Sequence, residues 1–436
     1  YVTIRKGICG QPVPYWSIEK VIENGLSNRI VDPNDAVEAL HESLKKAVKL
    51  RMVADVPIGA FLSGGVDSAT VVALMQAQSS AAVNTFSIGF REPGYNEAEF
   101  AKKVASYLGT KHHERYFSQD DVLELVPKIS SIFDEPFSDV SQLPTFLVSA
   151  MAKEKVTVAL SGDGGDELFC GYKRYKTTEE IWSKISKLPA RHLVAKVIGK
   201  IPTSALNSLF FLEAKAAKFG RQGKIGPKIK TLASWLNANS IDEFYKASIT
   251  HWKRKDNLII GSGFDEELFK NDLTAAPEFG ELMMYLDMVN YLPGDILTKV
   301  DRVAMSVSLE GRIPLLDHNV AELAWRMPLD IKQKDDVGKW PLKQVMYKYL
   351  PKELMDRPKM GFGVPIHEWL RGGLREWAQD LLSYDRIKNQ GVYNPVVVHS
   401  ALDKHMDGSE NNAAKLWNVL MVQAWLDGNK KRERSL

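Results

Sequence analysis

The chain has 436 residues, of which 44% are hydrophobic and 25% charged, and its formal net charge is +3. These values are typical of a soluble globular protein of two or three domains, and the nearly balanced charge favours neither a nucleic-acid nor a membrane partner. The two cysteines, Cys9 and Cys170, exclude a disulfide framework and a zinc array, and they indicate a cytoplasmic protein.

The predicted elements alternate between strands and helices in the first third of the chain. Residues 1–30, which are rich in glycine and proline, are expected to form a linker. After them, apolar spacing predicts helices over 35–52, 69–78, 98–108 and 143–153, and strands over 56–62, 83–90, 113–117 and 156–160. This alternation predicts a parallel sheet covered by helices, with ligands bound beyond the carboxyl ends of its strands.

The pattern becomes helical beyond about residue 180, where strand signals fade. A long helical stretch over 281–305 contains Pro293-Gly294, and we expect the helix to break there. We therefore predict a linker over 1–30, an α/β core over 31–180 and a helical part over 181–436.

The first motif is Ser63-Gly64-Gly65-Val66-Asp67-Ser68, which lies between a predicted strand and a predicted helix. Glycines let the backbone approach a ligand closely, and the N–H groups at a helix start favour an anion such as phosphate. A carboxylate beside phosphate repels it unless a divalent cation lies between them. The motif thus predicts a nucleotide phosphate with Mg²⁺.

The ordinary phosphate loop, G-x-x-x-x-G-K-[ST], is absent from the sequence. S-G-G-x-D-S is instead the fingerprint of enzymes that split ATP between its α and β phosphates. The alternative interpretation is a strand-to-helix turn that happens to contain glycine and serine.

A second glycine-rich turn, Ser161-Gly162-Asp163-Gly164-Gly165-Asp166-Glu167, follows the fourth predicted strand and carries three acids. Two turns at two strand ends can face each other across one nucleotide, so that Asp67 and Asp166 share a Mg²⁺ ion. The alternative is an acidic surface loop, and the spacing does not match an EF-hand.

These two motifs, in this order, resemble the synthetase domain of the glutamine-dependent asparagine synthetase family, and β-lactam synthetases are close relatives. The strings that carry the resemblance are SGGVDS (63–68), FSIGF (86–90), DEPFSDVSQLPTF (134–146), SGDGGDELFCGYKRY (161–175), LTKVDRVAMSVSLEGRIPLLDH (297–318) and RPKMGFGVPIHEWL (357–370). The resemblance covers the chain from about residue 30 nearly to its end. It implies a core of the PP-loop ATP pyrophosphatase type with a large helical C-terminal part.

The resemblance also implies an activity. ATP activates a carboxylate, with L-aspartate the first candidate, as an acyl-adenylate with release of pyrophosphate, and ammonia then forms the amide and releases AMP. The implied cofactors are ATP and Mg²⁺, and the ammonia normally comes from a glutaminase domain. A homodimer is a further expectation.

The family's functional positions map onto residues of this chain. Contacts to adenosine are implied for Leu62, Ile88, Gly89, Ser161 and Gly162, and contacts to pyrophosphate for Ser63, Gly64, Gly65, Val66, Asp67 and Ser68. Asp67 and Asp166 are the implied Mg²⁺ ligands. Asp163 matches an acidic position of the amide-forming half-reaction, Lys359 a lysine at the α-phosphate and Lys339 a lysine near pyrophosphate. Gly361 and Gly363 are expected to let the Lys359 loop close over substrate.

The sequence departs from the family pattern in two places. The N-terminal glutaminase domain, whose catalytic cysteine follows the initiator Met, is absent, and Cys9 does not match that cysteine, so we expect a fragment or another ammonia source. In addition, the R-A-S string, whose arginine suits a substrate carboxylate, is replaced by residues 137–145, which contain no arginine.

The second departure leaves alternatives for the acceptor and for the activity. One is an amidotransferase that acts on a sugar or secondary-metabolite carboxylate, or a β-lactam synthetase-like enzyme. Others are a tRNA-modifying or GMP-forming relative, and a module that binds ATP without catalysis.

Overall fold

The computed structural model describes residues 1–90, 97–202, 205–206, 225–253, 256–261, 273, 278–334, 337–356 and 364–433. The chain divides into two compact units, each formed by several segments. The first unit comprises Tyr1–Asp134, Asp139–Lys173 and Asp272–Val364, and the second comprises Glu135–Ser138, Arg174–Asn271 and Pro365–Leu436. No helix among the described residues is both long enough and apolar enough to span a bilayer.

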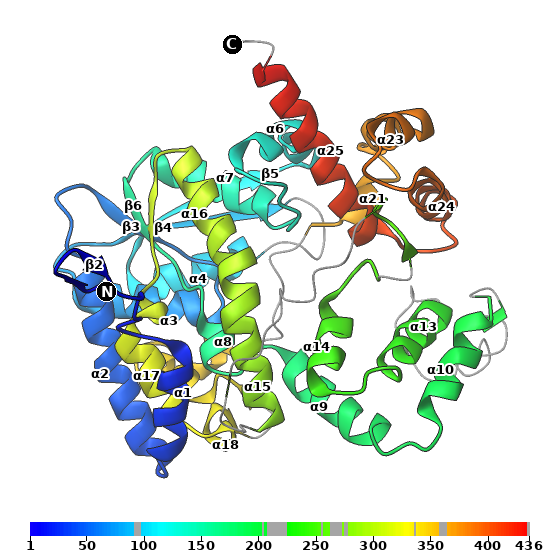
Figure 1. Ribbon diagram of the computed structural model, residues 1–436. Coiled ribbons are helices and arrows are strands. Elements are labelled where there is room, and N and C mark those ends of the chain that lie inside the picture. Colours follow the sequence, from blue (N-terminus) through cyan, green and yellow to red (C-terminus); the bar gives the residue numbers. More distant parts are fainter. Residues whose placement is uncertain are drawn as a thin grey trace. The chain divides into compact units, whose positions relative to one another are not determined.

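The first unit is built on a five-stranded parallel sheet with the strand order β5-β4-β3-β6-β7 (Figure 1). Its strands are β3 (Ile58–Phe61), β4 (Asn84–Phe90), β5 (Lys111–Phe117), β6 (Val158–Leu160) and β7 (Glu310–Arg312). The four strands expected from the sequence are confirmed. The fifth, β7, comes from the part of the chain that is predicted to be helical, and it pairs with β6 at the edge of the sheet.

The sheet register places the two glycine-rich turns side by side. β3 lies between β4 and β6, and Ala60 of β3 pairs with Leu160 of β6. Because the strands are parallel, the chain leaves both at the same edge of the sheet, within two residues of these partners. Each turn opens a helix, α3 (Val66–Ala77) after β3 and α8 (Gly165–Leu168) after β6.

Helices cover the sheet and supply most of its core. In α2 (Pro33–Arg51), Leu40, Leu44 and Val48 are fully buried, as their four-residue spacing predicts. The same apolar cluster includes side chains of α3, α4 (Ala98–Leu108), α17 (His318–Arg326) and α19 (Trp340–Tyr347). α4 ends at Gly109, whose φ of +70° is the left-handed cap that glycine favours.

One further helix and several short elements also belong to this unit. α7 (Gln142–Lys153) carries the chain toward β6 and its buried side contacts β4. The short elements are α5 (Gln119–Leu123), α6 (Val126–Ile129), η1 (Ser130–Ile132), η5 (Pro314–Leu316), α18 (Leu329–Lys332), β8 (Gln333–Lys334), β9 (Val337–Gly338) and α20 (Lys352–Met355).

The expected helix break at Pro293-Gly294 does not occur. α15 (Phe279–Leu286) continues into the π-helix η4 (Asp287–Leu297) and then into α16 (Thr298–Ser306). Proline lacks the N–H that an α-helical turn needs, and the wider π-helical turn accommodates Pro293 inside the segment instead of ending it. π-Helices are frequent at functional sites, and this one contacts α8 of the second glycine-rich turn.

Residues 1–30 contain regular structure. Strands β1 (Ile4–Arg5) and β2 (Ile8–Cys9) form a hairpin, and α1 (Ile18–Ser27), which Ser17 caps, packs against α17. Their assignment as a linker stays a prediction.

The second unit is helical in its described residues. Its helices are α9 (Lys173–Ile185), α10 (Arg191–Lys200), α13 (Ile225–Trp235), α14 (Ile241–Ile249), α21 (Ile366–Trp369), α22 (Arg375–Leu381), α23 (Tyr384–Gln390), α24 (Pro395–Met406) and α25 (Ala413–Glu433). The segment Asp272–Val364, which lies in the predicted helical part over 181–436, belongs to the unit that holds the sheet.

We predict that Gly25→Ala destabilises the first unit by about 2 kcal/mol, the usual cost of overpacking. A Cβ at Gly25 would lie 2.5 Å from the carbonyl oxygen of Trp325 and 2.7 Å from its carbonyl carbon, where α1 meets α17. Urea unfolding measures the change. Asn24→Ala, at the exposed neighbouring position of α1, is the control and should leave stability unchanged or slightly higher. Equal effects of the two variants would contradict the close packing of α1 on α17.

Candidate functional site

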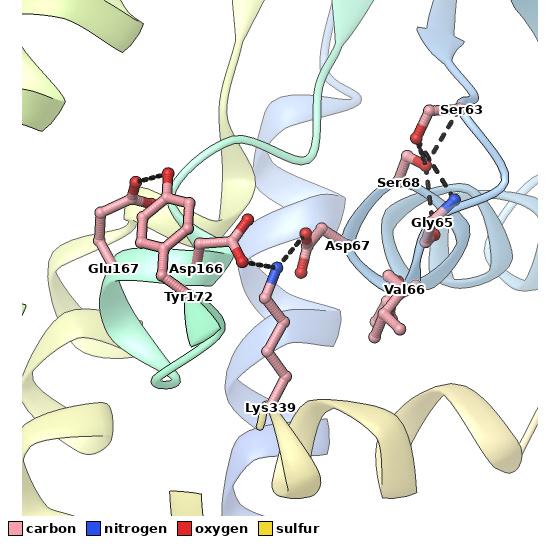
Figure 2. Close-up of polar contacts among 10 residues, drawn as sticks. Ser63, Gly65, Val66, Asp67, Ser68, Asp166, Glu167, Tyr172 and Lys339 are labelled. Carbon is pink, nitrogen blue, oxygen red and sulfur yellow. Dashed lines mark hydrogen bonds and ion pairs between the residues drawn. The ribbon is translucent and has the colours of Figure 1, made fainter. Parts of the chain in front are cut away.

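The first glycine-rich turn is ordered by its own serines. The hydroxyls of Ser63 and Ser68 lie 3.0 Å apart, and the Ser68 hydroxyl accepts from the Ser63 N–H (3.2 Å) and donates to the Gly65 carbonyl (3.3 Å) (Figure 2). Gly64 has a φ of +72°, which glycine adopts without strain, and Gly65 is the N-cap of α3. The turn therefore places the positive end of the α3 dipole at the carboxyl end of β3, where it can bind an anion.

The second glycine-rich turn touches the first directly. A Cβ at Gly162 would lie 2.6 Å from the Ser68 nitrogen and 2.8 Å from the Asp67 carbonyl carbon. A Cβ at Gly165 would overlap the Asp67 carboxylate. Only glycine fits at these two positions, so the backbones of the two turns meet as the sequence predicts for two turns that face one nucleotide.

Asp67 and Asp166, one from each turn, converge on a single cation. The Lys339 ammonium lies 2.5 Å from Asp67 Oδ2 and 2.9 Å from Asp166 Oδ1, and Figure 2 shows it between the two carboxylates. Lys339 precedes α19 and has a φ of +59°, an uncommon conformation for a residue other than glycine. Such backbone strain is concentrated at functional sites.

The electrostatics of this group favour the charged form of Lys339. Burial opposes the charged form of Lys339, but the attraction of Asp67 and Asp166 outweighs it and raises the pKa of the Lys339 ammonium. The Lys339 side chain is only 6% exposed, whereas those of Asp67 and Asp166 are 19% and 16% exposed. The carboxylates are thus the more accessible members of the group.

The donor set fits Mg²⁺ that arrives with a nucleotide. Among the residues that the structure describes, no three His, Cys, Asp or Glu side chains come together as a metal cage. Two converging carboxylates are nevertheless the usual protein share of a Mg²⁺ site, because Mg²⁺ keeps water and takes its other oxygens from substrate phosphates. In this structure the Lys339 ammonium lies between the same two carboxylates and balances their negative charge.

The sequence did not reveal a hydrogen-bonded pair beside the second turn, between the buried Glu167 and the partly buried Tyr172. Glu167 is 1% exposed, and the Tyr172 hydroxyl donates to its Oε1 at 2.6 Å. Burial raises the pKa of the Glu167 carboxyl to about 7, against the opposing effect of the Tyr172 hydrogen bond. The Tyr172 ring contacts Tyr291 of the π-helix edge-on, so η4 also contributes to this side of the site.

The adenosine-binding residues implied by the resemblance lie at the carboxyl ends of three adjacent strands. Leu62 follows β3, Ile88 and Gly89 lie in β4, and Ser161 and Gly162 follow β6. Leu62, Ile88 and Ser161 are almost completely buried. The buried Ser161 hydroxyl has no hydrogen-bond partner among the described residues, which leaves it available to a ligand. Lys359, Gly361 and Gly363 lie outside the described residues.

We predict that Lys339→Met lowers the free energy of unfolding by about 3 kcal/mol, because two partly buried carboxylates lose the cation they share. Urea unfolding with and without Mg²⁺ measures this, and Mg²⁺ should stabilise the variant more than the unchanged protein. Lys343→Met, one turn further along α19, is the matched control and should have little effect. A loss of stability no larger than that of the control would contradict this assignment of the ion pairs.

The comparisons with known proteins agree with the geometry. The family model described as asparagine synthase matches residues 39–427, and its PP-loop ATP pyrophosphatase fold confirms the predicted fold class. Asparagine synthetase [glutamine-hydrolyzing] 1 of Bacillus subtilis is 30% identical over 396 residues, which cover 89% of this chain and 59% of the relative. The putative asparagine synthetase [glutamine-hydrolyzing] 2 of Methanocaldococcus jannaschii is 39% identical over 284 residues, or 63% of this chain and 50% of the relative.

A more distant relative carries a different name. Amidase chyE of Penicillium rubens is 23% identical over 438 residues, which cover 93% of this chain and 63% of the relative. The chain spans less than two thirds of the length of each of these three curated relatives. It aligns with the synthetase part of the asparagine synthetases. On the family match over most of its length, the chain belongs to the ATP-dependent asparagine synthase family of carbon–nitrogen ligases.

Proposed function

We propose that this chain is the synthetase part of an enzyme that amidates L-aspartate to L-asparagine with ATP and Mg²⁺, through an acyl-adenylate. The observation that carries the proposal is the meeting of two glycine-rich turns at adjacent strand ends, which brings the Asp67 and Asp166 carboxylates to one point. Anion-binding N–H groups and paired carboxylates at one edge of a parallel sheet suit a nucleotide triphosphate with its metal ion.

The reaction has two steps that the site can support. An oxygen of the acceptor carboxylate attacks the α-phosphorus of ATP, the bond from that phosphorus to the bridging oxygen breaks, and pyrophosphate leaves. Ammonia then attacks the acyl carbon, AMP leaves with the former carboxylate oxygen, and the nitrogen loses a proton. Bound Mg²⁺ supplies positive charge to the departing pyrophosphate.

The residues have different tasks in these steps. The α3 N-terminus and the Ser63 and Ser68 hydroxyls bind the pyrophosphate oxygens, which accumulate charge as the bond breaks. Asp67 and Asp166 would hold a Mg²⁺ ion that arrives with the nucleotide, and the Lys339 ammonium beside them would supply positive charge to the phosphates. Asp163 accepts the proton that the attacking nitrogen loses, and Lys359 stabilises charge at the α-phosphate.

We propose that ammonia reaches the site from a glutaminase domain, because the relatives are named as glutamine-hydrolyzing enzymes. We further propose that the enzyme is a cytoplasmic homodimer. A second candidate function is amidation of another small carboxylate, such as a sugar acid. The replacement of the R-A-S string by residues 137–145, which contain no arginine, favours this candidate, because a substrate carboxylate then lacks its expected arginine.

We predict that Asp67→Asn lowers pyrophosphate release by about 100-fold or more, because a neutral amide neither holds the metal ion nor balances Lys339. The assay measures pyrophosphate from ATP with Mg²⁺, ammonium and a panel of carboxylates that includes L-aspartate, and the Mg²⁺ requirement should rise in the variant. Asp55→Asn, in an exposed loop of the same unit, is the control. Full turnover in Asp67→Asn would refute the assigned role of Asp67, and no release by the unchanged protein with any acceptor would refute the proposed function.

A further inference from the structure

Lys299, the second residue of α16, is held by two residues from the stretch that replaces the R-A-S string. Its ammonium lies 2.6 Å from Asp139 Oδ2 and donates to the Ser141 hydroxyl at 2.8 Å. The Ser141 hydroxyl in turn donates to Asp139 Oδ2 (2.6 Å), and the Ser141 N–H donates to Asp139 Oδ1 (2.9 Å). Three side chains thus form a closed triangle of hydrogen bonds, which fixes the direction of the Lys299 ammonium.

The triangle is shielded but not closed to a ligand. The side chains of Lys299 and Asp139 are 12% and 17% exposed. Burial opposes both charges, yet their mutual attraction outweighs it, and so the pKa of Lys299 is raised and the pKa of Asp139 is lowered. An ammonium has three N–H bonds. Asp139 and Ser141 take two of them in the described part of the chain, which leaves one for a further acceptor.

The triangle belongs to the same side of the sheet unit as the acidic turn. α16 packs against α7 and beside β7, and α7 leads into β6 and the turn that carries Asp163 (Figure 1). Asp163 and Asp295 are the other carboxylates that act on the charge of Lys299. Asp295 lies one turn earlier, in the π-helix.

This arrangement matches the head group of an amino acid. A carboxylate accepts the remaining Lys299 N–H, and an ammonium beside it is attracted to Asp163 and Asp295. Buried ion pairs contribute little net stability on average, so stability alone does not explain why Lys299 and Asp139 are held together.

We propose that Lys299, held in place by Asp139 and Ser141, binds the non-reacting carboxylate of the acceptor. The proposal rests on the proposed function, in that it concerns the acceptor of the same site. For a dicarboxylic acceptor such as L-aspartate, one carboxylate is activated and Lys299 is the residue that holds the other.

The test compares L-aspartate with β-alanine, which keeps the reacting carboxylate and the amine but lacks the second carboxylate. Binding of each is measured by calorimetry with Mg²⁺ and α,β-methylene-ATP, which prevents turnover, and by the KM of the acceptor and of ATP during turnover. In Lys299→Met, the affinity for L-aspartate should fall about 10- to 100-fold, the usual effect of losing a hydrogen bond between charged groups. The affinity for β-alanine and the KM of ATP should not change.

Three further variants separate binding from folding. Lys299→Arg should keep most of the preference for L-aspartate over β-alanine, because the charge and the donors remain. The double variant Asp139→Asn with Lys299→Met removes both buried charges together and should show the same selective loss, even if Lys299→Met alone does not fold. Lys153→Met, whose ammonium bonds the Ser308 carbonyl at the exposed end of α7, is the control.

Each outcome decides the proposal. The proposal is overturned if folded Lys299→Met, or the double variant, loses a similar amount of affinity for both ligands or loses none. It is also overturned if the unchanged protein binds β-alanine as tightly as it binds L-aspartate. If the unchanged protein releases no pyrophosphate with any acceptor but binds L-aspartate through Lys299, the proposed function fails and this inference stands. If it turns over monocarboxylates and does not bind L-aspartate, the ligase assignment stands and this inference fails.

Discussion

The structure depends on the contact between two glycine-rich turns at the carboxyl ends of neighbouring parallel strands. Because β3 and β6 are adjacent, the chain segments that follow them meet, and Gly162 lies against the backbone of Asp67 and Ser68. That contact brings two carboxylates to one point, where like charges repel unless a cation lies between them. The Lys339 ammonium meets this requirement in the structure, and a metal ion with its nucleotide meets it in the proposed reaction.

This requirement explains why so many parts of the chain converge on the same edge of the sheet. Lys339 reaches the carboxylates only because its backbone adopts a positive φ and because Gly171 and Gly338 leave room for it and for the segment that carries it. The π-helix η4 keeps the α15–α16 segment continuous past Pro293, so that Tyr291 reaches Tyr172 and Lys299 lies in the first turn of α16. Elements distant in sequence thus hold the two turns and the Asp139–Lys299 pair in one unit.

Local patterns predicted much of this arrangement. Strands β3, β4, β5 and β6 were predictable because apolar runs and glycine turns mark them, and the anion-binding turn was predictable because glycine, hydroxyl and helix start are contiguous. The sequence did not locate β7, because a strand of three residues carries too little of a repeating pattern. The helix break expected at Pro293 was wrong, because a π-helix accommodates the proline. The resemblance named Lys339, Asp67 and Asp166 but not the ion pairs between them, because the two carboxylates lie more than 170 residues from Lys339 in sequence. The Asp139–Lys299 pair spans a similar distance, and only the fold brings its members together.

The central claim is that the acceptor carboxylate is activated by adenylation at the point where the two turns meet. The most direct measurement uses L-aspartate labelled with ¹⁸O in its side-chain carboxylate, together with ATP, Mg²⁺ and ammonium, and follows the label by mass spectrometry. The account predicts one ¹⁸O atom in AMP, because the former carboxylate oxygen stays on the α-phosphorus when the amide forms. Consumption of ATP with the label in pyrophosphate or inorganic phosphate, or with no label in AMP, would contradict it.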